Sequence, residues 1–170
     1  MSLIEITDLT ITLDLPGGPM PVVRDVSLSL ERGEALGIVG ESGSGKSMTA
    51  LALMRLLPRV ARVKAKTLGF DGLDLTSLED ARFAADIAGP RIGMIFQEPM
   101  TSLNPVYTIG RQMTEGAVAR GMRPAQAREK AVALLDRVGI PDADARMTQY
   151  PHQMSGGQRQ RVMIAMALAN

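Results

Sequence analysis

Two glycine-rich segments carry the residues of this chain whose types and spacing are suited to holding an anion. The first, GESGSGKS at residues 40–47, matches the pattern G-x-x-x-x-G-K-[ST] and is called the phosphate loop below. Its glycines let successive backbone N–H groups surround phosphate oxygens. Lys46 would reach those oxygens as a point charge, and Ser47 would offer a hydroxyl to Mg²⁺. The loop therefore predicts a site for a nucleoside triphosphate.

The second segment, MSGGQ at residues 154–158, is a further anion-binding turn. Ser155 stands where a side chain caps a helix that begins near Gly156 or Gly157, and these glycines leave backbone N–H groups open to a ligand. Taken alone, an ordinary helix cap explains the segment equally well. The two motifs in this order, separated by a helical stretch, are far more specific than either one.

The composition excludes several classes of function. A net charge of +1 provides no basic face, and aromatic residues make up only 3% of the chain, so nucleic acid is not expected as a partner. The absence of cysteine excludes disulfides, zinc ribbons and thiol catalysis within these residues, and fits the cytoplasm. The N-terminus does not resemble a secretory signal, and no apolar stretch approaches the roughly 20 residues of a membrane-spanning helix.

The elements that must position the phosphate loop begin with strands. Residues 3–15 and 22–30 alternate apolar and polar side chains on either side of a PGGP turn, which predicts an antiparallel pair with an irregularity near Asp8. The continuous apolar run ALGIV at residues 35–39 is typical of a strand buried on both faces of a parallel sheet. Helical spacing then predicts a helix over residues 46–57, so that strand, loop and helix follow one another.

The rest of the chain is mainly helical by its pattern. A second buried strand is expected over residues 91–96, RIGMIF, with Gln97 at its end. Helices are expected over residues 78–85, 108–120, 124–138 and 159–169.

With these residues in view, the chain resembles the ATP-binding subunit of ABC transporters over essentially its whole length. MSGGQ is similar to that family's signature motif LSGGQ, with Met154 in place of leucine, and FQEP corresponds to the family's Q-loop at Gln97. The segments GESGSGKS, FQEPMTSLNP and YPHQMSGGQRQRVMIAMALA most closely resemble the oligopeptide, dipeptide and nickel importer group.

The resemblance implies an α/β fold of the P-loop NTPase, ABC ATPase type. Such a fold has an N-terminal antiparallel β portion, an incomplete RecA-like core and an inserted helical subdomain. We divide the chain accordingly into residues 1–96 for the β portion and core, residues 97–153 for the helical subdomain, and residues 154–170 for the signature motif and its helix.

The resemblance also implies a head-to-tail dimer, with either an identical or a paralogous partner, that encloses Mg-ATP. The implied catalytic residues are Lys46 and Gln97, and the implied Mg²⁺ contacts are Ser47 and Gln97. The residues implied to bind ATP are Gly40, Glu41, Ser42, Gly43, Ser44, Gly45, Lys46 and Ser47 of one subunit, with Ser155, Gly156, Gly157 and Gln158 of the other.

The activity implied by the resemblance is ATP hydrolysis coupled to import of peptides, nickel or similar small solutes. The subunit would lie in the cytoplasm, on the inner face of the cell membrane, bound to permease subunits. The family's Walker B strand with its catalytic glutamate is expected beyond Asn170, so we expect a truncated chain that binds nucleotide. The alternatives are a fragment that does not hydrolyse ATP and a soluble ABC ATPase not tied to transport, which the absence of a basic face disfavours.

Recognition of adenine is the point at which the sequence departs from this family. Family members usually stack the base on an aromatic side chain upstream of the phosphate loop, but residues 1–40 contain no Phe, Tyr or Trp. Leu13 is the best positional match and would give only apolar contact.

Overall fold

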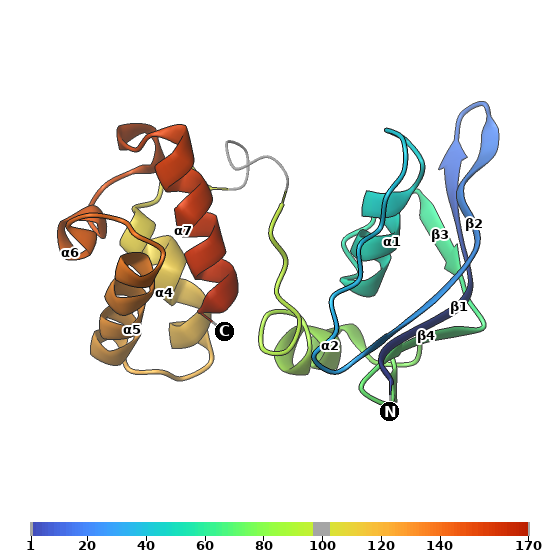
Figure 1. The fold of residues 1–170 in the computed structure, drawn as a ribbon, viewed down its shortest axis with the longest axis horizontal. Helices are drawn as coiled ribbons and strands as arrows, with labels where there is room; N and C mark the ends of the chain where they lie inside the picture. The colour runs from blue at the N-terminus through green and yellow to red at the C-terminus, as the bar shows by residue number, and fades with distance from the viewer. Residues whose placement is uncertain (1, 97–102, 170) are drawn as a thin grey trace. The chain divides into compact units, whose positions relative to one another are not determined.

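The long alternating stretches form an antiparallel pair of strands, as predicted. The computed structural model of the chain describes residues 2–96 and 103–169. In it β1 (Ser2–Leu15) and β2 (Gly18–Glu31) run side by side along almost their whole length (Figure 1). The pairing shifts register between Ile6 and Leu9, where Asp8 adopts a φ of 54°. The predicted irregularity near Asp8 is therefore confirmed.

Three short strands complete this sheet. They are β3 (Ala61–Lys64), β4 (Thr67–Phe70) and β5 (Leu73–Asp74). Both β3 and β4 pair with β1, and the order across the sheet is β2-β1-β4-β5, with β3 off this path. Strands of two to four residues are too short to show a period of two, so the sequence did not predict them.

The helix that follows the phosphate loop is shorter than the sequence predicts. It is α1 (Lys46–Leu53), and it ends four residues before the predicted boundary at Leu57. The cause is Arg55, whose φ of 53° is left-handed and cannot continue a right-handed helix. The short helix expected over residues 78–85 is confirmed as α2 (Asp80–Asp86).

The two buried parallel strands predicted at residues 35–39 and 91–96 are wrong. Neither segment is in a strand, and none of their large side chains is fully buried; Val39 is 95% exposed and Phe96 45%. A strand buried on both faces needs neighbouring strands to accept its backbone hydrogen bonds. Among the described residues, the only pairing in either segment is an isolated bridge between Ala88 and Ile92.

The helices predicted in the second half of the chain are confirmed. They are α4 (Ile109–Ala119), α5 (Pro124–Arg137) and α7 (Gly156–Leu168), with α6 (Ala143–Arg146) and the short 3₁₀ helix η1 (Pro151–Gln153) between the last two. Figure 1 shows α4, α5 and α7 packed together. Their shared core consists of Leu103, Ile109, Met113, Ala131, Leu135, Ile140, Ala143, Met147, Met154, Val162, Met163 and Ala165.

The chain divides into two compact units, Met1–Ala84 and Ala85–Asn170, which we call the N-terminal unit and the C-terminal unit. The N-terminal unit contains the sheet and the phosphate loop, and the C-terminal unit contains the helical core and the SGGQ segment, residues 155–158. None of the helices in residues 2–96 and 103–169 has the length and apolar character needed to cross a membrane.

Candidate functional site

The phosphate loop is fixed against the sheet by a close approach at Gly45. This residue is the N-cap of α1 and has a φ of 91°. A Cβ atom added there would lie 2.8 Å from the Val22 carbonyl oxygen and 2.9 Å from Cγ2 of Val23, both on β2. Glycine is therefore required at this position, because the backbone is left-handed and because β2 leaves no room for a Cβ atom. This close contact holds the start of α1 against β2.

The ammonium group of Lys46 is held inside the loop. Its Nζ donates to the carbonyl oxygens of Gly40 and Glu41, each at 2.7 Å, and to Oγ of Ser44 at 3.2 Å. An ammonium group has three N–H donors, so each of them has an acceptor within the loop itself. The positive charge is therefore positioned at the first turn of α1 by oxygen atoms of the loop itself.

The first turn of α1 has further backbone donors to offer. No side chain among the described residues caps this helix at Gly45. The first amides of a helix have no acceptor within the helix, and they lie at its positive end. This end of α1 can therefore hold an anion through backbone N–H groups as well as through Lys46.

The other predicted residues of the loop are contiguous with this turn. Ser47 is exposed on the first turn of α1, beside Lys46. A Cβ atom added at Gly40 would lie 2.8 Å from Oγ of Ser44, so the two sides of the loop are in close contact. The remaining exposed residues of the loop are Glu41, Ser42, Gly43 and Ser44.

Thr49 supports the site but was missed by the sequence analysis. It is a buried polar residue, and its backbone N and Oγ1 both donate to the carbonyl oxygen of Gly45, at 2.9 and 3.1 Å. These bonds secure the first turn of α1. The available signal was a hydroxyl residue on the buried face of an apolar helix, three positions after Lys46.

The SGGQ segment forms the N-terminus of α7. Oγ of Ser155 accepts a hydrogen bond from the backbone N of Gln158 at 3.3 Å, and Oε1 of Gln158 accepts one from the backbone N of Ser155 at 2.9 Å. This reciprocal pair is a capping box. Gly156 and Gly157 are exposed, and an added Cβ at either would meet no described atom within 4 Å.

The residues just before this segment are structural. Met154 is 5% exposed and belongs to the helical core, as a residue replacing leucine should. The ring of His152 stacks on Tyr150 with the centroids 5.7 Å apart. His152, the chain's one histidine, is exposed.

The predicted site residues fall into three groups by position. Residues 40–47 lie in the N-terminal unit, residues 155–158 lie in the C-terminal unit, and Gln97 lies outside the described residues. Within residues 2–96 and 103–169, no cluster of three or more His, Asp or Glu side chains could hold a metal ion.

Comparison with known proteins gives a family match and relatives that agree with one another. The family model described as ABC transporter matches residues 23–170. The chain is 48% identical over 168 residues to a putative peptide import ATP-binding protein of Brucella abortus (strain 2308), covering 98% of this chain and 50% of that protein. It is 45% identical over 170 residues to the dipeptide transport ATP-binding protein DppD of Escherichia coli (strain K12), covering 99% and 52%. The chain thus spans about half the length of the curated relatives it matches.

Solved structures agree with this match. The ATP-binding cassette MJ0796 in a dimeric post-hydrolysis state bound to ADP and Pi has a TM-score of 0.79 and 27% identity, with 98% of this chain and 69% of that chain covered. A second dimeric structure of the same cassette has a TM-score of 0.79 and 28% identity, with the same coverage. The predicted fold class, an α/β fold of the P-loop ABC ATPase type, is confirmed.

Proposed function

Because this chain belongs to the ABC transporter family, we propose that it supplies the ATP-binding part of an ABC importer. ATP binding and hydrolysis by the whole protein would drive uptake of peptides, nickel or similar small solutes. The support for an importer is the 45–48% identity to proteins whose names describe peptide import and dipeptide transport.

The observation that carries the proposal is the arrangement at the start of α1. Lys46 is held by two carbonyl oxygens of its own loop, next to a helix N-terminus without a side-chain cap among the described residues. A triphosphate carries several negative charges, and both features favour an anion at this point. Lys46 would bind phosphate oxygens and offset the charge that develops on them during hydrolysis.

Mg²⁺ would bind beside the phosphates. The exposed Ser47 follows Lys46 on the first turn of α1, and its hydroxyl is the kind of hard oxygen ligand that Mg²⁺ accepts. When bound, Mg²⁺ would neutralise phosphate charge. Gln97 would be its second protein contact and would orient the attacking water, as the Q-loop resemblance implies.

The second half of the ATP site would come from another ATP-binding subunit, identical or paralogous. In a head-to-tail pair, Ser155, Gly156, Gly157 and Gln158 of that subunit would face the phosphates held by the first. The two exposed glycines support this role because no described atom lies within 4 Å of a Cβ built on either of them. Permease subunits would hold the pair on the cytoplasmic face of the membrane.

Equilibrium binding of Mg-ATP, measured by titration calorimetry, tests the proposal. The chain should bind Mg-ATP, and Lys46→Ala should weaken binding by about 100-fold, because charge-assisted hydrogen bonds to phosphate are lost. Lys64→Ala is the matched control, since Lys64 is an exposed lysine on β3 of the same unit, and it should bind as the wild type does. Equal affinity of the Lys46 variant and the wild type would contradict the proposal.

A further inference from the structure

The end of α1 has an unusual residue in a position that favours glycine. The backbone N of Arg55 donates to the Ala52 carbonyl at 3.2 Å, and that of Leu56 donates to the Leu51 carbonyl at 3.0 Å. These two bonds define a Schellman motif, whose left-handed residue is here Arg55, at a φ of 53°. This backbone conformation costs free energy for any residue with a Cβ atom. Something else must therefore stabilise Arg55 in it.

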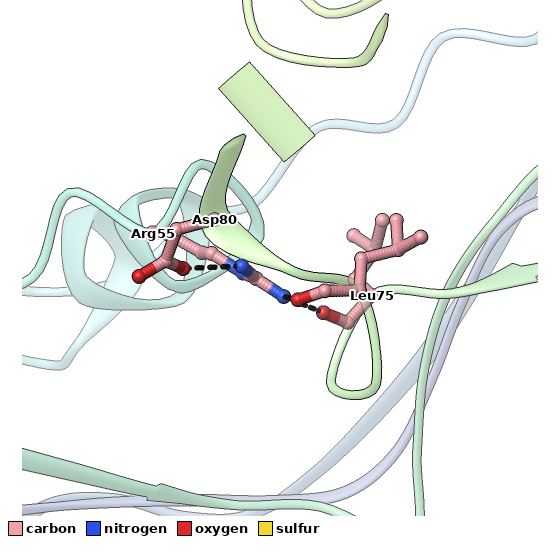
Figure 2. Close-up of polar contacts among 4 residues, drawn as sticks. Arg55, Leu75 and Asp80 are labelled. Carbon is pink, nitrogen blue, oxygen red and sulfur yellow. Dashed lines mark hydrogen bonds and ion pairs between the residues drawn. The ribbon is translucent and has the colours of Figure 1, made fainter. Parts of the chain in front are cut away.

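The side chain of Arg55 provides that stabilisation. Its guanidinium donates to Oδ1 of Asp80 at 2.6 Å, to the Leu78 carbonyl at 2.7 Å and to the Leu75 carbonyl. It also lies over the ring of Phe83, with Cζ 4.6 Å from the centroid. Figure 2 shows the side chain reaching Asp80 at one side and Leu75 at the other. The Arg55 side chain is only 25% exposed, and its bonds to the Leu75 and Leu78 carbonyls are partly shielded from water. The Asp80 carboxylate, by contrast, is exposed.

These contacts join α1 to a different part of the N-terminal unit. Leu75 and Leu78 lie in the turn that follows β5, and Asp80 and Phe83 lie on α2. The opposite end of α1 is held on β2, where Gly45 approaches the Val22 carbonyl. The helix that carries the phosphate-binding residues is therefore fastened at both ends.

We propose that Arg55 is a positioning residue for phosphate binding. It would act through α1, since it lies nine residues after Lys46, about 14 Å along a helical path. By fixing the far end of α1, Arg55 holds the direction of the helix and so the placement of Lys46 and Ser47. The inference rests on the proposed function, because it assumes that these two residues hold the phosphates and Mg²⁺ of ATP.

Arg55→Gly is the variant that separates positioning from stability. Glycine adopts the left-handed conformation without the cost that arginine bears, so its gain in the backbone offsets part of the lost side-chain contacts. We expect the melting temperature to change by no more than about 3 °C. The Kd for Mg-ATP, measured well below the melting temperature, should rise about 5-fold, which is the size of effect seen for residues that act without touching the ligand.

Two further variants should raise the Kd for Mg-ATP by smaller amounts than Arg55→Gly does. Arg55→Lys keeps one charged donor but not the planar fork, so its Kd should fall between those of the wild type and Arg55→Gly. Asp80→Asn removes the charge of one partner. Because the Asp80 side chain is 98% exposed, we expect this variant to fold as the wild type does. Its Kd should rise about 2-fold. Arg62→Ala is the control. It also removes an arginine ion pair of this unit, but that pair joins Arg62 to Asp14 within the sheet and does not include a residue of α1.

The outcomes are distinct for the two proposals. If the wild type binds Mg-ATP and both Arg55→Gly and Asp80→Asn bind it equally well, Arg55 only ends the helix and the inference is overturned. If Arg55→Gly does not fold, Asp80→Asn and Arg55→Lys decide the matter by the same criterion. If the wild type does not bind Mg-ATP, the proposed function fails and the inference falls with it.

Discussion

The N-termini of α1 and α7 both follow glycine-rich segments, yet the two helix ends differ in how they are capped. At α7 the side chains of Ser155 and Gln158 form a reciprocal cap. At α1 the N-cap is Gly45, and no side chain in the described part of the chain takes that role. The start of α7 is therefore capped by its own side chains. The first amides of α1 have no side-chain acceptor among the described residues, so an anion such as the proposed triphosphate could accept their hydrogen bonds.

The glycines of the two segments also serve different purposes. Gly45 is in contact with β2 and has a left-handed backbone, so it is needed for the fold. Gly156 and Gly157 are exposed, and among the described atoms none lies within 4 Å of a Cβ built on either. These two glycines are therefore not needed for packing within the C-terminal unit. The comparison indicates that glycines in two similar motifs can have different roles. Gly45 is needed for the helix to pack on the sheet, whereas Gly156 and Gly157 leave the backbone of α7 accessible.

The largest expected effect on stability is that of Gly45→Ala. The added Cβ would clash with the Val22 carbonyl and the Val23 side chain, and the backbone would be strained at a φ of 91°. We expect the free energy of unfolding, from urea denaturation, to fall by about 3 kcal/mol. A fall as small as that of an ordinary surface substitution would show that the close approach to β2 does not fix the loop.

Removal of the cap at α7 should have a smaller effect. Ser155→Ala should lower the free energy of unfolding by about 1 kcal/mol, because one backbone donor loses its acceptor. Ser42→Ala, in the phosphate loop, is the matched control, since Ser42 is exposed and α1 has no side-chain cap in the described residues. It should change stability by less than about 0.5 kcal/mol. Equal losses in the two variants would remove the distinction between the two helix ends.

Gly157→Ala should act in the opposite direction. Alanine is a better helix former, and in α7 its Cβ has free space, so stability should rise by about 0.5 kcal/mol. Chemical denaturation in the absence of nucleotide provides the measurement. A loss of stability would mean that this glycine, like Gly45, is required by the fold.

The smallest effect is expected for a surface pair of the C-terminal unit, Arg128 and Asp144. NH1 of Arg128 donates to Oδ1 of Asp144 at 2.6 Å, and this hydrogen bond lowers the pKa of Asp144 below its ordinary value of 3.8. A lowered folded pKa gives stability that is present above the ordinary value and is lost as the pH falls through the folded pKa. Arg128→Ala should therefore lower the urea midpoint slightly near about pH 7, and this difference from the wild type should shrink as the pH falls below the ordinary pKa of Asp144. A difference that grows as the pH falls would contradict this sign.

The sequence predicted those elements whose structure depends on residues close together in the chain. The alternation of residues 3–15 and 22–30 is long enough to define both strands, with Asp8 as the interruption. The helix start after Ser155 was predicted from a hydroxyl side chain that can accept a backbone hydrogen bond, and the structure shows this cap. Thr108 caps α4 in the same way, although the sequence predicted that helix only from its spacing. The phosphate loop was recognised for the same reason, because its glycines and Lys46 are adjacent in the chain.

The errors arose where distant residues decide the structure. Residues 35–39 and 91–96 have the composition of buried strands, but whether they join a sheet depends on partner strands elsewhere. The early end of α1 depends on Arg55, whose left-handed conformation is stabilised by contacts with residues 75–83. A glycine at position 55 would have predicted this helix end from the sequence, whereas an arginine there does not.

In the proposed function, backbone amides of the phosphate loop hold the phosphates of ATP together with Lys46. Amide hydrogen exchange with and without saturating Mg-ATP tests it most directly, at a protein concentration low enough to keep the chain monomeric. We expect amides of residues 41–47 to exchange more slowly when nucleotide is present, and amides of residues 156–158 to exchange at an unchanged rate. Unaltered exchange at residues 41–47 while Mg-ATP is bound would contradict this expectation.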